Sequence, residues 1–382
     1  MRTTTIRFMC YFLPIILGIV AGVFGSEEIV YIATFISYLF VSALKWLSIP
    51  MIFLSILDTT SGLQSKNELL MLGAKIFKYT LFTTFLAASI ALAFFLLLQP
   101  ANSELLEVSS NAVALDNSSL FSIMLLLTVS LTFATSIWIL SCHPAQKKNI
   151  HHKVSRFYSK IMKLIQLILK AMPVAIWAFS VLFVHRLNGL AIQSLALYLA
   201  CVVLANISQG IVVLPILLRI KHISPIKAFK GMAPALSIAF WSKSSGVALP
   251  VAIESIQSNL QVDPKVARFA LPECTTINMN ACAAFILITV LFVSQSHGVV
   301  FTSKELLLWV GIATVAAIGN AGVPMGCYTL SCALLSYMEV PLHLLGLILP
   351  FYTLIDMLES AINVWSDGCV TLIVNKEFKS TV

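Results

Sequence analysis

One apolar stretch near the end of the chain carries an unusual concentration of polar side chains. Within residues 355–368, IDMLESAINVWSDG, carboxylates, a hydroxyl and an amide recur at helical spacing, as Asp356, Glu359, Ser360, Asn363 and Asp367. At ~100° per residue these five side chains fall on one helical stripe about 100° wide. Carboxylate and amide oxygens are hard ligands that suit sodium, and the same groups bind ammonium and carboxylate groups of solutes. The stripe therefore predicts a site for a solute together with a cation.

The composition places this stripe in a membrane. Of 382 residues, 59% are hydrophobic and 10% are charged, and the mean hydropathy is +0.95. Soluble domains carry roughly 25% charged residues, so an ordinary soluble enzyme, a disordered chain and a fibrous repeat are excluded. The net charge of +8 does not indicate a nucleic-acid partner, because the basic residues lie in short segments between apolar runs. We expect an all-α protein in a lipid bilayer, whose intramembrane carboxylates mark a substrate or ion path.

The first 220 residues predict six simple membrane spans. The apolar runs lie at 8–25, 31–57, 70–98, 119–141, 161–184 and 191–218. Lysine and arginine follow the second, fourth and sixth runs, whereas the alternate loops are acidic or nearly neutral. The positive-inside rule then predicts that both termini are cytoplasmic. The first run resembles a signal peptide, but the further spans behind it favour a retained helix.

Two later apolar segments are interrupted by residues that break helices. Segment 226–257 contains SKSSG and Pro250, and segment 305–345 contains GNAGVPMG; uninterrupted helices are expected at 266–294 and 346–374. Backbone groups freed inside lipid need partners. Paired interruptions of this kind point to the binding site of a secondary transporter, although two kinked helices in a bundle would give the same pattern.

Other chemistry is not indicated. The eight cysteines show no CxxC spacing and lie mostly in apolar runs, so we interpret them as small buried hydrophobic residues. The chain has no P-loop, no glycine pattern of a dinucleotide-binding fold and no recognisable pairing of a nucleophile with a base. The sequence therefore does not predict an enzyme.

Several motifs together resemble the dicarboxylate/amino acid:cation symporter family, which has the glutamate transporter fold. They are LKWLSIPMIFLSIL at 44–57, AFWSKSSGVALP at 239–250, TTINMNACA at 275–283, IGNAGVPMG at 318–326 and the stretch at 355–368. The last motif is similar to the D-x-x-E-[ST]-x-x-N stretch of the bacterial serine/threonine:sodium symporters.

The resemblance implies eight transmembrane helices and two re-entrant helical hairpins, arranged as inverted repeats in a homotrimer that works as an elevator. Scaffold helices 1–2 would occupy 1–69 and scaffold helices 4–5 would occupy 101–190. The transport domain would comprise helix 3 at 70–100 and residues 191–382, the latter with helix 6, hairpin 1 at 226–257, helix 7 at 266–294, hairpin 2 at 305–345 and helix 8 at 346–374. The compact loops favour a bacterial inner membrane.

The resemblance also implies roles for single residues. Asp356 would hold the ammonium group of an amino-acid substrate, and Asn363 would hold its carboxylate. The other residues of the substrate pocket would be Ser245, Cys282, Val323, Glu359 and Ser360. One sodium ion would lie between Asp367, Asn278 and the carbonyls of Asn363 and Cys274. A second would lie between Thr276, the Met279 sulfur and carbonyls near Ala317, Ile318 and Asn320.

Glu359 departs from the family pattern, because members that carry acidic amino acids have an arginine there. Two like charges 4 Å apart at an effective dielectric near 20 repel by about 4 kcal/mol, which is roughly a thousandfold in affinity. We therefore expect sodium-coupled import of a small neutral amino acid resembling serine, threonine or alanine; a basic substrate is electrostatically compatible as well.

Two other functions remain open. One is a carrier for glutamate, aspartate or a dicarboxylate, coupled to sodium or to protons, with Glu359 neutralised by Lys243 or by a proton. The other is a substrate-gated anion channel or a nutrient sensor, against which the intact Asp356, Asn363 and Asp367 argue.

Asn280 is a second departure, because the family has an aspartate there that serves a third sodium site together with hydroxyls at the positions of Thr83 and Thr84. A neutral amide weakens a cation site, and Thr80 replaces a tyrosine in the same region. We expect one or two coupled sodium ions rather than three. Glu273 is interpreted as a carboxylate near the cytoplasmic mouth or paired with Lys265 or Arg268, with proton coupling as the alternative.

Overall fold

The computed structural model describes residues 2–62, 67–101, 131, 134–135, 138–139, 142, 144–185, 189–320 and 325–379. Within these ranges the chain forms helices joined by short turns, and no β-strand occurs among them. The helices are α1 (Arg2–Phe24), α2 (Glu27–Gly62), α3 (Asn67–Leu98), α5 (Pro144–Lys170), α6 (Met172–His185), α7 (Gly189–Ser208), a π-helical turn (Gln209–Val213), α8 (Leu214–Ile220), α9 (Pro225–Ser242), α10 (Ser245–Ser258), α11 (Pro264–Ile277), α12 (Asn280–Ser296), α13 (Ser303–Gly319), α14 (Gly326–Tyr337) and α15 (His343–Lys379).

The all-helical prediction is confirmed for the described residues. Among them, three stretches are long and apolar enough to cross a membrane, Leu72–Leu98, Gln193–Ile220 and Pro264–Ser296. A fourth is formed by α15 if its two parts, which meet at an angle of 65°, count as one span. The predicted span at 119–141 lies almost entirely outside the described residues, so the expected count of eight stays a prediction.

Helix α5 differs from the sequence-based expectation. The apolar run at 161–184 was expected to form one span, with the basic residues before it in a loop. Instead α5 begins at Pro144, includes that basic segment and ends at Lys170, and α6 begins at Met172. Proline suits the first turn of a helix, where its missing N–H costs nothing, and both helices have one there. Continuous apolar runs do not predict the start of α5, because its first half is rich in basic and polar residues.

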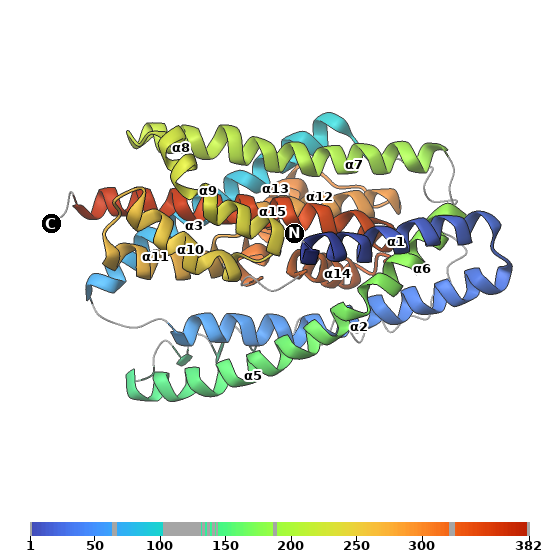
Figure 1. The fold of residues 1–382 in the computed structure, drawn as a ribbon, viewed down its shortest axis with the longest axis horizontal. Helices are drawn as coiled ribbons and strands as arrows, with labels where there is room; N and C mark the ends of the chain where they lie inside the picture. Colours follow the sequence, from blue (N-terminus) through green and yellow to red (C-terminus); the bar gives the residue numbers. More distant parts are fainter. Residues whose placement is uncertain are drawn as a thin grey trace.

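The helices lie roughly along one direction (Figure 1). In this view α7 runs along one edge, α2 and α5 lie along the opposite edge, and α15 passes through the middle with α3 and α12. Helices α1, α2, α5 and α6 pack mainly on one another. By contrast, α3 packs against α7, α11, α12, α13 and α15, although it precedes α5 in the chain.

Helix α12 forms the centre of the larger core. Every residue from Asn280 to Ser294 is buried, and the helix contacts α3, α7, α13, α14 and α15. A helix that is apolar on all sides is stable only when other elements surround it. The segments that interrupt the surrounding helices are therefore brought against α12 and α15.

The predicted interruptions are present at both hairpins. Between α9 and α10, Lys243 adopts a left-handed conformation with φ of 54°, and the Ser244 hydroxyl caps α10 by accepting the N–H of Val247 at 3.3 Å. Between α13 and α14, Met325 is left-handed with φ of 57°, immediately before α14 starts at Gly326. These turns place the N-termini of α10 and α14 next to α15.

A third interruption was not expected. The helix predicted at 266–294 is divided into α11 and α12 by Asn278 and Met279, whose backbones are not helical. The amide of Asn278 bonds to Ser366 and Asp367 on α15, at 2.9 Å in each case. These side-chain bonds stabilise the break, and because their partners lie on another helix, the local sequence does not predict it.

Candidate functional site

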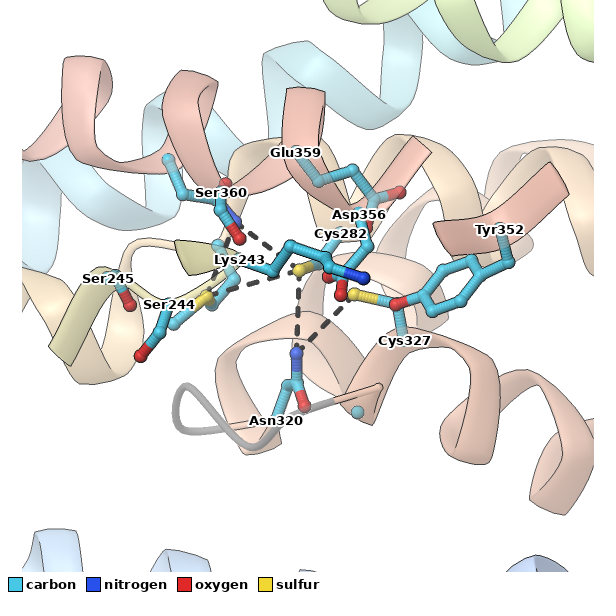
Figure 2. Close-up of a pocket in the computed structure, with 13 residues that line it drawn as sticks. Lys243, Ser244, Ser245, Cys282, Asn320, Cys327, Tyr352, Asp356, Glu359 and Ser360 are labelled. Atoms are coloured by element: carbon cyan, nitrogen blue, oxygen red, sulfur yellow. Dashed lines mark hydrogen bonds between the residues drawn. The ribbon is translucent and has the colours of Figure 1, made fainter. Parts of the chain in front are cut away.

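A small polar cavity lies between α15 and the interrupted segments (Figure 2). Its volume of about 30 Å³ is room for about two water molecules. The lining residues are Lys243, Ser244, Ser245, Met279, Cys282, Asn320, Gly326, Cys327, Tyr352, Asp356, Glu359, Ser360 and Asn363. Six of the residues predicted to bind substrate are among them, and the seventh, Val323, lies outside the described residues.

Helices α10, α12, α14 and α15 and the ends of α9 and α13 position these side chains. Helix α15 contributes Asp356, Glu359, Ser360 and Asn363 from the stripe that helical spacing predicts. Helices α10 and α14 both begin at the cavity. Their first backbone N–H groups and positive dipole ends favour a negatively charged group at that place. The cavity thus combines carboxylates with two helix N-termini that suit an anionic group.

Lys243 adds a cation to the cavity. Its left-handed backbone ends α9 and brings the side chain to the same lining as Asp356 (Figure 2). The ammonium group lies near enough to Asp356 to attract its carboxylate electrostatically. Of the two α15 carboxylates that Lys243 could pair with, Glu359 and Asp356, the structure favours Asp356.

Glu359 is a buried carboxylate of the cavity. The side chain is 1% exposed, and neither carboxylate oxygen has a hydrogen-bond partner within the part of the chain that the structure describes. A buried polar group without a partner is costly. Glu359 is therefore suited to accept a hydrogen bond from a bound molecule or to hold a cation.

The amide of Asn363 is oriented by its neighbours. Its Oδ1 accepts the backbone N–H of Ala281 at 2.9 Å. Its Nδ2 points toward the Met279 and Cys282 sulfurs, at 3.5 and 3.4 Å. The donor side of the amide therefore faces the cavity, as a role in holding a carboxylate requires.

A second polar cluster surrounds Asp367, one turn further along α15. Asp367 is 2% exposed and accepts hydrogen bonds from Asn278 at 2.9 Å and from Thr275 at 3.4 Å. No salt bridge joins it to a cationic side chain in the described ranges. The Cys274 carbonyl is close by, because it accepts the Asn278 N–H at 2.8 Å. A buried carboxylate that has only neutral partners fits a bound cation.

The residues of the expected second sodium site are only partly brought together. Met279 and Asn320 line one cavity, and the Ala317 carbonyl accepts the Asn320 N–H at 3.1 Å. The Thr276 hydroxyl, however, donates to the Glu273 carbonyl at 2.8 Å. That these residues and Ile318 together bind one sodium ion stays a prediction.

The residues of the expected weak third site do meet. Thr84 donates to Oδ1 of Asn280 at 2.8 Å, and Thr83 donates to Oδ1 of Asn278 at 3.2 Å. The amide nitrogen of Asn280 donates to Ser366 at 2.6 Å. Each polar group here thus has a neutral partner, which agrees with a weakened cation site.

Some lining residues were missed by the sequence analysis. Tyr352 precedes Asp356 by four positions and so lies on the same stripe of α15; a wider helical count would have included it. Cys327 and Gly326 begin α14, and their approach to Cys282 leaves no signal in sequence spacing.

Glu273 makes no salt bridge with Lys265 or Arg268 among the described residues, so that expected pairing is not observed.

Comparison with known proteins gives relatives that are named as amino acid transporters. Mouse excitatory amino acid transporter 3 is 31% identical over 217 residues, which are 56% of this chain and 42% of that protein. Human neutral amino acid transporter A is 29% identical over 178 residues, 46% of this chain and 34% of that protein. The Caenorhabditis elegans protein glt-4, named for sodium-dependent excitatory amino acid transport, is 33% identical over 193 residues, 50% and 37% of the two chains. The matches thus span less than half the length of these relatives.

The sequence profile of the sodium:dicarboxylate symporter family matches residues 9–377, which is nearly the whole chain. The family and these relatives are transporters, so the prediction that the chain is not an enzyme is confirmed. This chain is an integral membrane protein that belongs to the sodium:dicarboxylate symporter family.

Proposed function

We propose that this protein is a sodium-coupled symporter that imports a small neutral amino acid such as serine, threonine or alanine. The observation that carries the proposal is the buried carboxylate of Glu359, which lines the cavity with both oxygens unpartnered among the described residues. It would accept a hydrogen bond from a substrate hydroxyl. It would repel a second carboxylate by about 4 kcal/mol at 4 Å and an effective dielectric near 20.

The rest of the cavity suits the backbone of an amino acid. Asp356 would bind the ammonium group in place of Lys243, and the Asn363 amide and the two helix N-termini would bind the carboxylate. Ser245, Ser360 and Cys282 would complete the walls, together with Val323. The present volume of about 30 Å³ is too small for an amino acid, since it accommodates about two waters. Binding therefore requires the walls to separate.

Sodium would provide the coupling. The Asp367 carboxylate and the carbonyls of Cys274 and Asn363 offer oxygen ligands of the kind that sodium prefers. The Asn278 amide, whose nitrogen donates to Asp367 in this structure, would turn its oxygen toward the ion. With Asn280 in place of a carboxylate, one or two ions would move with each substrate. A sodium ion at Asp367 would compensate the buried charge.

The working protein would be a homotrimer with a scaffold and a moving transport domain, in a bacterial inner membrane with cytoplasmic termini. The packing of α1, α2, α5 and α6 on one another supports the scaffold, and the packing of α3 on the later helices supports its place in the transport domain.

A second function is favoured by Lys243. A cation in the cavity could neutralise Glu359 or hold a substrate side-chain carboxylate, and excitatory amino acid transporters are among the relatives. The protein would then carry glutamate, aspartate or a dicarboxylate, coupled to sodium or to protons.

Uptake into proteoliposomes distinguishes the two functions. Labelled serine, threonine, alanine, glutamate and lysine are offered with and without an inward sodium gradient. We expect sodium-dependent uptake of the neutral amino acids and none of glutamate. Glutamate uptake without serine uptake would overturn the proposal in favour of the second function.

A further inference from the structure

Two thiols and a carboxylate meet at one wall of the cavity. The Sγ atoms of Cys282 and Cys327 and a carboxylate oxygen of Glu359 all lie within 4.8 Å of one another, and all three residues are buried. They come from three different helices, α12, α14 and α15. The proposed transport function uses Glu359 to select the substrate side chain and Cys282 as a pocket wall, and it gives no role to Cys327.

Amide groups are directed at the two sulfurs. Nδ2 of Asn320 lies 3.4 Å from the Cys282 sulfur and 3.5 Å from the Cys327 sulfur (Figure 2). Nδ2 of Asn363 lies 3.4 Å from the Cys282 sulfur. Amide donors stabilise a thiolate, and they form the outer shell typical of a thiolate metal site. Cysteines that act only as small buried hydrophobic residues need no such donors.

The third member of the cluster is the buried carboxylate of Glu359. Both carboxylate oxygens of Glu359 are without a hydrogen bond among the described residues, although the side chain is 1% exposed. An anionic oxygen beside two sulfurs completes a set of three ligands. Two thiolates and a carboxylate suit zinc, whereas sodium prefers oxygen ligands alone.

We propose that Cys282, Cys327 and Glu359 bind a zinc ion inside the cavity. Zinc lies about 2.3 Å from sulfur and about 2.0–2.2 Å from oxygen, so a tetrahedral site places its ligand atoms roughly 3.5–3.8 Å apart. The present separations, within 4.8 Å, need to shorten by about 1.3 Å at most. Each thiol that binds loses its proton to the solvent. The fourth position remains open to water.

Zinc at this site would oppose transport. It would occupy Glu359, and it would tie the start of α14 to α12 and α15, so that the cavity walls could not separate. This consequence rests on the proposed transport function, whereas the binding itself does not.

Zinc binding is tested on the purified full-length protein in detergent with a non-thiol reductant. Zinc chloride is titrated against a chromogenic chelator, and cobalt chloride is used to detect the charge-transfer absorption of thiolate ligands. Wild type should bind one zinc ion and show that absorption. Cys282→Ala and Cys327→Ala should each weaken binding at least tenfold, and Asn320→Ala should weaken it by about 10- to 100-fold.

The matched control is Cys332→Ala, which removes a buried thiol from the same helix as Cys327 and should bind zinc as wild type does. If the wild-type protein with cobalt shows no thiolate charge-transfer absorption, the inference is overturned. This result does not depend on whether any variant folds. Equal zinc affinity in wild type and in folded Cys282→Ala and Cys327→Ala also overturns it.

A separate uptake assay tests the consequence for transport. Micromolar zinc should inhibit amino-acid uptake by wild type and by Cys332→Ala, but not uptake by Cys327→Ala. Failure of uptake without zinc would count against the proposed function, while the binding titration would still decide the zinc site.

Discussion

The amide nitrogen of Asn278 lies 2.9 Å from Oδ1 of Asp367 and donates a hydrogen bond to it. This bond joins the break between α11 and α12 to the last helix. It also orients the amide oxygen of Asn278 toward Thr83 on α3, whose hydroxyl donates to it at 3.2 Å. The carboxylate that would bind sodium is therefore held by the same residue that interrupts the central helix.

Asp367→Asn tests the cation site. Removing the charge should weaken sodium binding at least tenfold, because the carboxylate is the only anionic ligand proposed there. Ligand binding stabilises the folded state, so sodium should raise the unfolding temperature of wild type but not of the variant. Glu254→Gln, which changes an exposed carboxylate on α10, is the control. Equal stabilisation of Asp367→Asn by sodium would contradict the site.

Asn280→Asp should restore a stronger third cation site. The new carboxylate would lie next to Thr84, which now donates to Oδ1 of Asn280 at 2.8 Å. A carboxylate binds sodium better than an amide does. The sodium dependence of uptake should become steeper, with a higher Hill coefficient than wild type. The control variant Asn280→Ala should not raise this Hill coefficient. An unchanged coefficient in folded Asn280→Asp would show that this position does not limit stoichiometry.

Gly326→Ala tests the packing of the second hairpin. A Cβ at this position would lie 1.4 Å from Oδ1 of Asn320, so the Asn320 side chain would have to leave its place beside the two cysteines. We expect uptake to fall at least severalfold although the protein stays folded. Gly311→Ala is the matched control on α13, since a Cβ there meets no atom of the described residues within 4 Å. Equal uptake by both variants would argue against a role for Asn320.

Lys243→Met separates the two candidate functions. If Lys243 competes with the substrate ammonium for Asp356, its removal should lower the Kd for serine severalfold. If Lys243 instead holds a substrate carboxylate, the same change should abolish glutamate transport. The measurement is the equilibrium Kd of serine and of glutamate for the wild type and the variant. Lys265→Met, which removes an exposed positive charge, is the charge-matched control.

The sequence predicted what depends on regular spacing and local chain breaks. The stripe from Asp356 to Asn363 follows from helical periodicity, and the turns at Lys243 and Met325 follow from serine, glycine and proline in apolar segments. The break at Asn278 was missed, because side chains on another helix stabilise it. The meeting of Cys282 with Cys327 was missed for a similar reason, since it depends on how α12 and α14 pack.

The central claim is that Glu359 selects a neutral substrate, and uptake by Glu359→Arg tests it most directly. Wild type and variant are reconstituted side by side, and the ratio of serine to glutamate uptake is measured under one sodium gradient. The account predicts that wild type transports serine, whereas the variant loses serine uptake and gains glutamate uptake, because arginine binds a carboxylate through two hydrogen bonds. A folded variant whose ratio stays that of wild type would contradict the placement of Glu359 against the substrate side chain.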